Sequence, residues 1–303
     1  MRACLAALFA LGAAAVSACG AGSNGPSQNG LTPAPESAPP PATQPAAQPD
    51  VTALRLYDSA SVHSTLAVSP LFWTLLDDDE MWTAGPCIFD SGSVEISLDG
   101  ASMTTPGTIL PTGSHRLGAN FAHCLVDGLG GVVLHGTSAT TYTTADRSDL
   151  TALVSVTSLR GTGAAYQSDL YDVTADGSGT WRRMRIGATF AETYAPTPGS
   201  TLVNNSTTQI ATFEGGSYSF VWDPFVLVPN AAGALDEDFD NLLVAVGGTH
   251  YALNGHLRTL YSRSSERTYA GEVRITNHNA LAARVIGTGG ALRTETLSPL
   301  APF

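Results

Sequence analysis

The sequence predicts an all-β fold, an antiparallel meander that forms a large curved sheet, an open barrel or a sandwich. Three observations predict it. Segments after position 90 alternate apolar and polar residues, as half-buried strands do. Thr and Val, which suit pleated surfaces, are plentiful throughout. Long helical periodicity is missing, and Gly or Asn pairs suited to tight turns separate the alternating segments.

The clearest strands lie at the two ends of this region. The segment GSVEISLDG places Val94, Ile96 and Leu98 on one face, and GEVRITNHNALAARVIG reads as two strands around a turn at 277–279. Between them, the pairs at 247–248 (Gly-Gly) and 254–255 (Asn-Gly) predict two hairpin turns, because both tolerate positive φ.

One segment favours a helix, over residues 69–80. Ser69 suits a helix cap, Pro70 suits the first helical position, and Leu and Phe side chains follow at spacings that form one apolar face. Farther along, one strand face carries Tyr218, Phe220, Trp222 and Phe225, which predicts an aromatic stripe in the core.

The N-terminus carries a targeting signal. A positive start precedes an apolar run that is too short to span a bilayer, which is typical of a signal peptide. The run ends in Val16-Ser17-Ala18-Cys19, which resembles the lipobox of bacterial lipoproteins. The resemblance implies that residues 1–18 are removed and that Cys19 is lipidated. Inner-membrane lipoproteins usually carry Asp after this cysteine, whereas this chain has Gly20. The resemblance therefore implies a place at the outer membrane, on its periplasmic face or surface.

Residues 19–50 hold Gly, Ser, Asn, Pro, Ala and Gln with scarcely any large apolar side chain. Such a segment cannot bury enough surface to offset its ordering entropy, so we interpret it as a disordered tether behind the lipidated cysteine. The remaining segment, 51–303, has the length of one large β-rich domain or of two similar halves, at about 51–180 and 181–303.

The charge balance narrows the range of partners. The chain has 14 basic and 26 acidic residues, a net charge of −12, which argues against nucleic acid as a partner. The expected partner is the membrane, through the lipid anchor. The sequence does not identify a protein partner or an apolar small-molecule partner.

Ala122-His123-Cys124 resembles the segment around the catalytic histidine of the trypsin family, and FDSGS (89–93) resembles that family's nucleophile loop. In that family the histidine precedes the serine, whereas Ser91 lies upstream of His123 here. We therefore predict no catalytic residue and place His123 on a strand beside a half-cystine.

The number of cysteines that remain after processing explains the segment around Cys124 better than a protease active site does. Cys4 leaves with the signal peptide and Cys19 is lipidated, so Cys87 and Cys124 remain in an oxidising compartment and predict a disulfide. Closing this loop of about 38 residues stabilises the fold by about 4 kcal/mol on chain-entropy grounds. The alternative is a metal site that combines Cys124 with His115, His123 or His135.

The acidic run DEDFD begins like a calcium loop but lacks the later Gly and Glu of an EF-hand. We interpret it as a solvated loop and predict no metal site and no cofactor. Asp236, Asp238 and Asp240 are the residues that would hold Ca²⁺ in the alternative interpretation.

The lipobox, the tether, the two cysteines, and the LNG, GEVRIT and GALR segments together resemble a group of uncharacterised proteobacterial envelope lipoproteins. This group implies no activity. The sequence therefore predicts a non-enzymatic structural, adhesive or binding module on a lipid anchor. The alternative is a periplasmic carrier of a lipid or other apolar ligand, which needs an apolar cavity on the concave face of the sheet. A hydrolase is the third class.

Overall fold

The structure is a computed structural model. It describes residues 51–68, 74–75, 87, 92–103, 108–109, 111–126, 132–145, 148–163, 170–186, 189–223, 231–262 and 267–303. The predicted signal peptide, Cys19 and the tether lie outside these residues. Within them the all-β prediction is confirmed, because one large antiparallel sheet accounts for most of the chain and a single helix, α1 (Val51–Ala67), packs against it.

The strands follow one another along the chain. Their bounds are β1 (Thr74–Leu75), β2 (Ser93–Leu98), β3 (Ala101–Ser102), β4 (Thr108–Ile109), β5 (Gly113–Val126), β6 (Val132–Thr144), β7 (Asp149–Thr162), β8 (Asp172–Ile186), β9 (Thr189–Pro196), β10 (Thr201–Asn204), β11 (Gln209–Asp223), β12 (Ala231–Val246), β13 (Thr249–Ser262), β14 (Arg267–Asn277), β15 (Ala280–Gly289) and β16 (Ala291–Thr296).

The main sheet is a meander with antiparallel neighbours. It runs from β3 and β2 at one edge through β5, β6, β7 and β8 to β16 at the other. Strands β9 and β10 share one position, since both lie between β8 and β11 and are separated by the short turn after Pro196. Strands β1 and β4 form a separate parallel pair. One continuous meander of this kind has mostly sequential pairings, which is the arrangement that the alternating segments predict.

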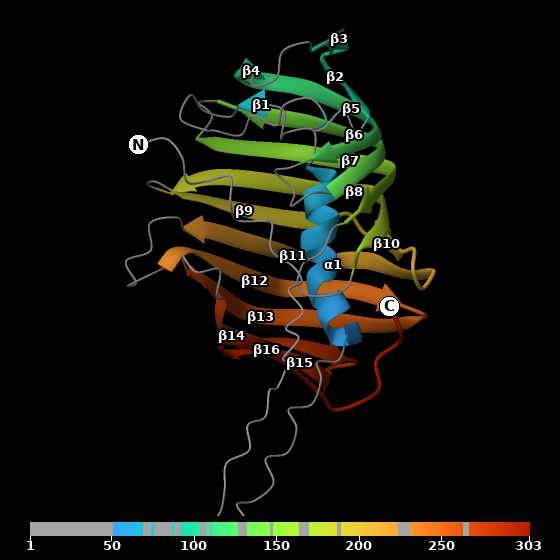
Figure 1. The fold of residues 1–303 in the computed structure, drawn as a ribbon, viewed down its shortest axis with the longest axis vertical. Helices are drawn as coiled ribbons and strands as arrows, with labels where there is room; N and C mark the ends of the chain where they lie inside the picture. The colour runs from blue at the N-terminus through green and yellow to red at the C-terminus, as the bar shows by residue number, and fades with distance from the viewer. Residues whose placement is uncertain are drawn as a thin grey trace, which may run out of the picture.

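Helix α1 lies across the strands on the concave side of the sheet, nearly perpendicular to them (Figure 1). It contacts β7, β8 and β9 in one half of the meander and β11, β15 and β16 in the other. Every residue of α1 whose side chain the structure describes is buried or half-buried. The helix is therefore the central element of the hydrophobic core, and the sheet curves around it.

The sequence of α1 explains why pattern analysis did not find it. A helix that is covered on most sides has apolar residues on most sides, so it lacks the single apolar stripe of a surface helix. It ends just before Ser69-Pro70, and a residue before proline is disfavoured in helical geometry. The helix predicted over 69–80 is wrong where it can be tested, because Thr74 and Leu75 form β1. The rest of that segment lies outside the described residues.

Three β-bulges with the same geometry bend the sheet. Each places two residues opposite one: 122–123 opposite His135, 157–158 opposite Asp176, and 240–241 opposite Asn254. The second residue of each pair has positive φ (54° at His123, 47° at Ser158, 45° at Asn241), and a glycine follows each opposing residue. A bulge of this kind increases local twist and bends its strand, so the three bulges help to curve the sheet around α1.

The bulges correct one turn prediction. Asn254 and Gly255 lie inside β13 and not at a hairpin turn, and the Asn254 Oδ1 accepts a hydrogen bond from the Asn241 backbone N–H at 2.9 Å. Gly255 has a φ of +135°, and an added Cβ would lie 2.2 Å from the Glu272 carbonyl oxygen. The other two turns are confirmed at Gly247-Gly248 and at His278-Asn279.

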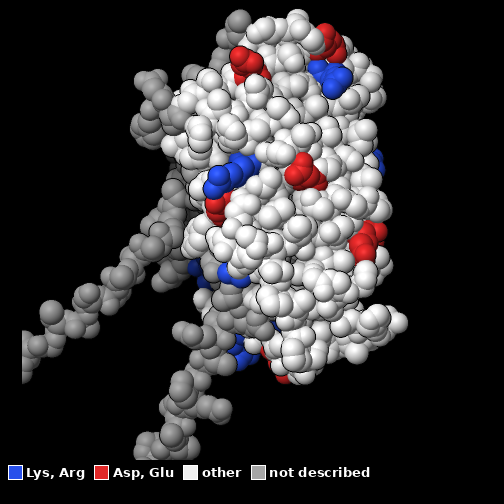
Figure 2. Space-filling model, turned by 90° about the vertical axis from the view of Figure 1, so that its right-hand side faces the viewer, with Lys and Arg blue, Asp and Glu red and all other residues white. Residues whose placement is uncertain are grey.

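The outer face of the sheet is polar. Cross-strand ion pairs join Arg160 to Asp172 and Arg182 to Asp149, both at 2.6 Å. Figure 2, which views the right-hand side of Figure 1, shows charged side chains as a few separated groups on a largely uncharged surface. Exposed pairs of this kind each contribute about 0–1 kcal/mol, so they keep the surface hydrated more than they stabilise the fold.

In the part of the chain that the structure describes, α1 falls short of the length and apolarity that a membrane-crossing helix requires.

Candidate functional site

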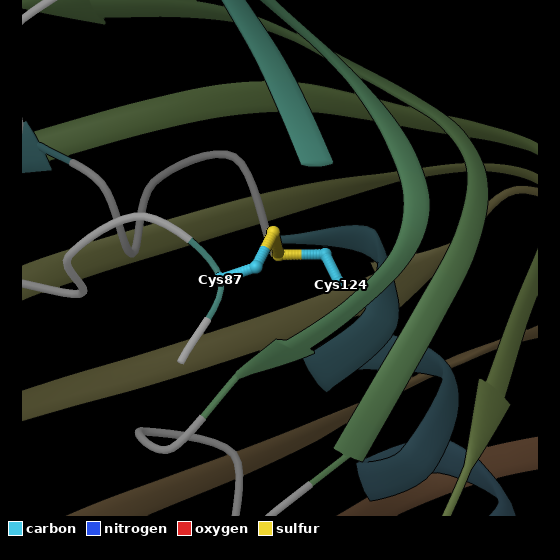
Figure 3. The surroundings of a disulfide bond; sticks show 2 residues. All are labelled: Cys87 and Cys124. Carbon is cyan, nitrogen blue, oxygen red and sulfur yellow. A yellow bond between two sulfur atoms is a disulfide. The ribbon is translucent and has the colours of Figure 1, made fainter. Parts of the chain in front are cut away.

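The disulfide predicted from the two remaining cysteines is present. Cys87 and Cys124 are bonded, with their Cα atoms 4.8 Å apart (Figure 3). Cys124 lies next to the first bulge of β5 and is fully buried, and Cys87 is 8% exposed. The bond therefore ties the connection between α1 and β2 to the sheet. Because Cys124 is consumed in the disulfide, it is not available to the metal site considered as the alternative.

The first polar contact between α1 and the sheet involves a buried carboxylate. Tyr57 of α1 donates a hydrogen bond to one oxygen of Glu237 at 2.5 Å, and Tyr218 of β11 donates to the other at 2.7 Å. Glu237 is 6% exposed. Burial raises the pKa of the Glu237 carboxyl, and the two phenol hydrogen bonds act in the opposite direction. Burial and the nearby Glu237 carboxyl raise the pKa of Tyr57.

The second polar contact between α1 and the sheet involves His63, which lies closer to the C-terminal end of the helix than Tyr57 does. His63 is fully buried. The Tyr194 hydroxyl donates to its Nδ1 at 2.8 Å, and its Nε2 lies 3.4 Å from the Asp176 carbonyl oxygen. The Phe213 ring packs edge-on against the imidazole, with ring centroids 5.0 Å apart. Burial lowers the pKa of His63 to about 4, so the neutral imidazole is the form in the core.

Side chains of α1 occupy the concave side of the sheet where the structure describes it. Apolar side chains of α1, such as Leu56 and Leu66, are buried there beside the hydrogen-bonded Tyr57 and His63. A hollow of about 320 Å³ lies instead on the outer face, lined by Asn254, Gly255, Glu272 and Arg274. A carrier needs its space on the concave face, and there the described residues place a helix.

The acidic run DEDFD lies within strand β12 and not in a loop. Strand alternation turns Asp236, Asp238 and Asp240 away from Glu237 and Phe239, which are both buried. His256 of β13 contacts Asp236 at 3.3 Å and Asp238 at 3.0 Å. Two carboxylates of this run therefore share one histidine on the neighbouring strand, and one acid of the run, Glu237, faces α1.

Two further histidines pair with carboxylates on the surface. His115 Nδ1 lies 2.7 Å from an Asp99 oxygen, and its Nε2 lies 3.1 Å from the Thr112 carbonyl oxygen. Both ring nitrogens therefore face acceptors, and the hydrogen bond to Asp99 raises the pKa of His115. His250 contacts Glu214 at 2.8 Å. An imidazole held by two acceptors is poorly arranged to act as a general base.

His123 and His135, two of the histidines named for the alternative metal site, lie side by side. Their ring centroids lie 4.9 Å apart, and both residues are exposed. Neither ring contacts a carboxylate among the described residues. Ser91, the other residue of the protease resemblance, lies outside those residues, and the described arrangement at His123 is a histidine pair. Within the same described ranges, no group of three or more His, Cys, Asp or Glu side chains is arranged to hold a metal ion.

Comparison with known proteins returns no match, whether with protein-family models, with curated proteins or with solved structures.

Sequence reasoning missed the residues that join α1 to the sheet. Glu237 was grouped with three outward-facing aspartates, although the period of two in a strand separates it from them. His63 lies in α1, a helix that the sequence pattern does not predict. One signal could have indicated both His63 and Glu237: the segment of α1 is largely apolar but contains polar side chains. Polar groups on a helix in the core need hydrogen-bond partners on the elements that cover it.

Proposed function

We propose that this protein is a lipid-anchored envelope lipoprotein whose β-rich domain is a non-enzymatic binding, adhesive or structural module. Cys19 carries the lipid, residues 20–50 form the tether, and the domain acts at the outer membrane, on its periplasmic face or surface. In this proposal the functional surface is the outer face of the sheet.

One observation carries the proposal. Helix α1, the first element after the predicted tether, is buried in the concave face and bonded there through Tyr57 and His63. Its position supports a domain whose interior is already occupied. It also supports an attachment in which a pull on the tether acts on the centre of the core and not on a loosely held terminus.

The arrangement of the outer histidines supports a non-enzymatic role. His115, His250 and His256 are paired with carboxylates in exposed positions, and no serine hydroxyl contacts them in the described part of the chain. General acid–base chemistry needs a group whose proton can reach a substrate in a cleft, and these pairs lie on an open strand face.

Metabolic labelling tests the anchor. The full chain is expressed in a bacterial host with an alkyne-bearing fatty acid, and we expect label on the wild type and none on Cys19→Ala. The double variant Cys87→Ala, Cys124→Ala is the matched control and keeps its label. Label that persists in Cys19→Ala would overturn the lipoprotein assignment.

The carrier is the second candidate, and the position of α1 gives it a specific requirement. An apolar ligand would have to displace α1 from the concave face. Native mass spectrometry of the lipidated full chain in mild detergent separates the two functions. A further adduct of lipid mass would favour the carrier, and the mass of the acylated chain alone would favour the module.

A further inference from the structure

We propose that His123 and His135 form a two-histidine binding site for a divalent transition metal, with Cu²⁺ preferred and Zn²⁺ or Ni²⁺ bound more weakly. Imidazole suits these ions, and affinity for nitrogen ligands rises through Ni²⁺ to Cu²⁺ and falls again at Zn²⁺. The site lies on the outer face of β5 and β6, independent of the function proposed above.

The three bulges provide the argument, because they allow the same two positions to be compared. At two bulges the opposing side chain caps the bulge: Asp176 accepts from the Ser158 N–H at 2.7 Å, and Asn254 accepts from the Asn241 N–H at 2.9 Å. These side chains stabilise the positive φ of the bulged residue and have a clear structural role.

At the bulge between β5 and β6, both of these positions are histidine. His123 occupies the positive-φ position and His135 the opposing one, and no hydrogen bond joins the His135 ring to the bulge among the described residues. The two rings lie against each other instead. A capping role therefore does not explain this pair, whereas a pair of neighbouring nitrogen ligands does.

The histidines of the outer face show the same contrast. His115, His250 and His256 each contact a carboxylate, which occupies a ring nitrogen. His123 and His135 are exposed and have no carboxylate contact within the described ranges, so their ring nitrogens are open to a metal ion. The nearby Arg160 is paired with Asp172 through two hydrogen bonds, of 2.8 and 2.6 Å, which reduces its repulsion of a cation.

The geometry allows both rings to reach one ion. Metal–imidazole bonds measure about 2.0–2.1 Å for zinc. Rings with centroids 4.9 Å apart reach a shared ion by rotation about the ring torsion, which has broad minima. No third protein ligand joins them in the described part of the chain, so water would fill the other coordination positions.

Isothermal titration of the metal-free full chain in detergent with Cu²⁺ tests the site. We expect one binding event whose affinity falls at least tenfold in His123→Asn and in His135→Asn. Asn suits the positive-φ position of His123, so the first variant keeps the bulge. The matched control is His278→Asn, an exposed histidine with a φ of 46° in a turn, which should bind as the wild type does.

Electron paramagnetic resonance of the Cu²⁺-loaded protein gives a second readout. Two nitrogen ligands are expected in the wild type and one in either variant. His135 lies opposite the bulge and not in it, so its variant decides the outcome if His123→Asn does not fold. Absence of Cu²⁺ binding by the wild type, or equal affinity in the wild type and His135→Asn, would overturn the proposal.

Discussion

The phenol of Tyr57 on α1 donates a hydrogen bond of 2.5 Å to Glu237 on β12, a residue 180 positions away in the chain. This bond joins the first described element to the second half of the meander, in a place where neither group reaches bulk water. Tyr218 donates to the other carboxylate oxygen, so Glu237 holds two phenols in position. The contact gives α1 a defined depth and rotation that apolar packing alone would leave less specific.

Replacement of Glu237 by Leu is expected to destabilise the domain by about 2–6 kcal/mol, because it leaves two buried phenols without an acceptor and each costs about 1–3 kcal/mol. Glu237→Gln keeps one carbonyl acceptor and should cost less. Urea unfolding at pH 7 measures both. The control is Asp238→Asn, an exposed neighbour on the same strand, which should stay within about 0.5 kcal/mol of the wild type.

Glu237 also gives stability a pH dependence of known sign. Its pKa is raised in the folded state, so the native protein holds this proton more tightly than the unfolded chain does. The associated stability is present below pH 4.5 and is lost as pH rises through the folded pKa. Glu237→Gln should remove this loss, and a variant that keeps the wild-type slope would contradict the assignment.

His63 gives a dependence of the opposite sign. Its pKa falls from 6.5 to about 4 on burial, so stability declines as pH falls from 6.5 towards 4, by roughly 3 kcal/mol when fully expressed. We expect His63→Leu to abolish this decline while costing about 1–2 kcal/mol at pH 7, because the Tyr194 phenol loses its acceptor. Urea unfolding from pH 4 to 7 measures both effects.

The Glu237 effect begins above pH 4.5, inside the range from 4 to 6.5 in which the His63 effect is expressed, so single variants alone do not separate them. The double variant Glu237→Gln, His63→Leu should have a nearly flat profile in this window. His278→Asn, at an exposed turn, should follow the wild type. A decline on acidification that survives in His63→Leu would place the responsible group elsewhere.

The strands were predictable because their signals are local. Val94, Ile96 and Leu98 alternate along β2, and His278-Asn279 supplies the positive φ of its turn. Tyr218 was predicted as part of a core stripe and is buried. Period and turn chemistry can be read within a few residues of sequence.

The features that the sequence did not predict depend on contacts between residues that are distant in the sequence. Asn254-Gly255 has the sequence of a tight turn, yet the same positive φ serves a bulge once β12 and β14 lie on either side of it. Helix α1 becomes stable when the whole sheet covers it, and its buried Tyr57 and His63 depend on Glu237 and Tyr194. The residue pattern within one segment predicts neither the bulge at Gly255 nor the buried contacts of α1.

The disulfide was predicted from the oxidising compartment and from the number of cysteines that remain after processing. Its contribution to the free energy of unfolding can be measured. The double variant Cys87→Ala, Cys124→Ala should lose about 4 kcal/mol, because the unfolded chain regains the freedom of the open loop. Alanine is preferred to serine, since Cys124 is fully buried and a hydroxyl there would need a partner. Thiol titration of the denatured, unreduced protein should find neither Cys87 nor Cys124 free. Wild-type stability in the double variant would contradict the prediction.

The bulge glycines give the most direct test of how the sheet bends. Gly255 and Gly215 have similar conformations, with φ of +135° and +145°, but their surroundings differ. An added Cβ at Gly255 would lie 2.2 Å from the Glu272 carbonyl oxygen, whereas at Gly215 nothing lies within 4 Å. Both alanine variants carry the backbone strain of a positive φ, so the difference between them isolates the close approach of the strands. We expect Gly255→Ala to be less stable than Gly215→Ala by about 2 kcal/mol or more in urea unfolding, because backbone atoms must move to relieve the contact. Equal losses would mean that β13 and β14 separate easily at this bulge, and that curvature around α1 does not depend on their close packing there.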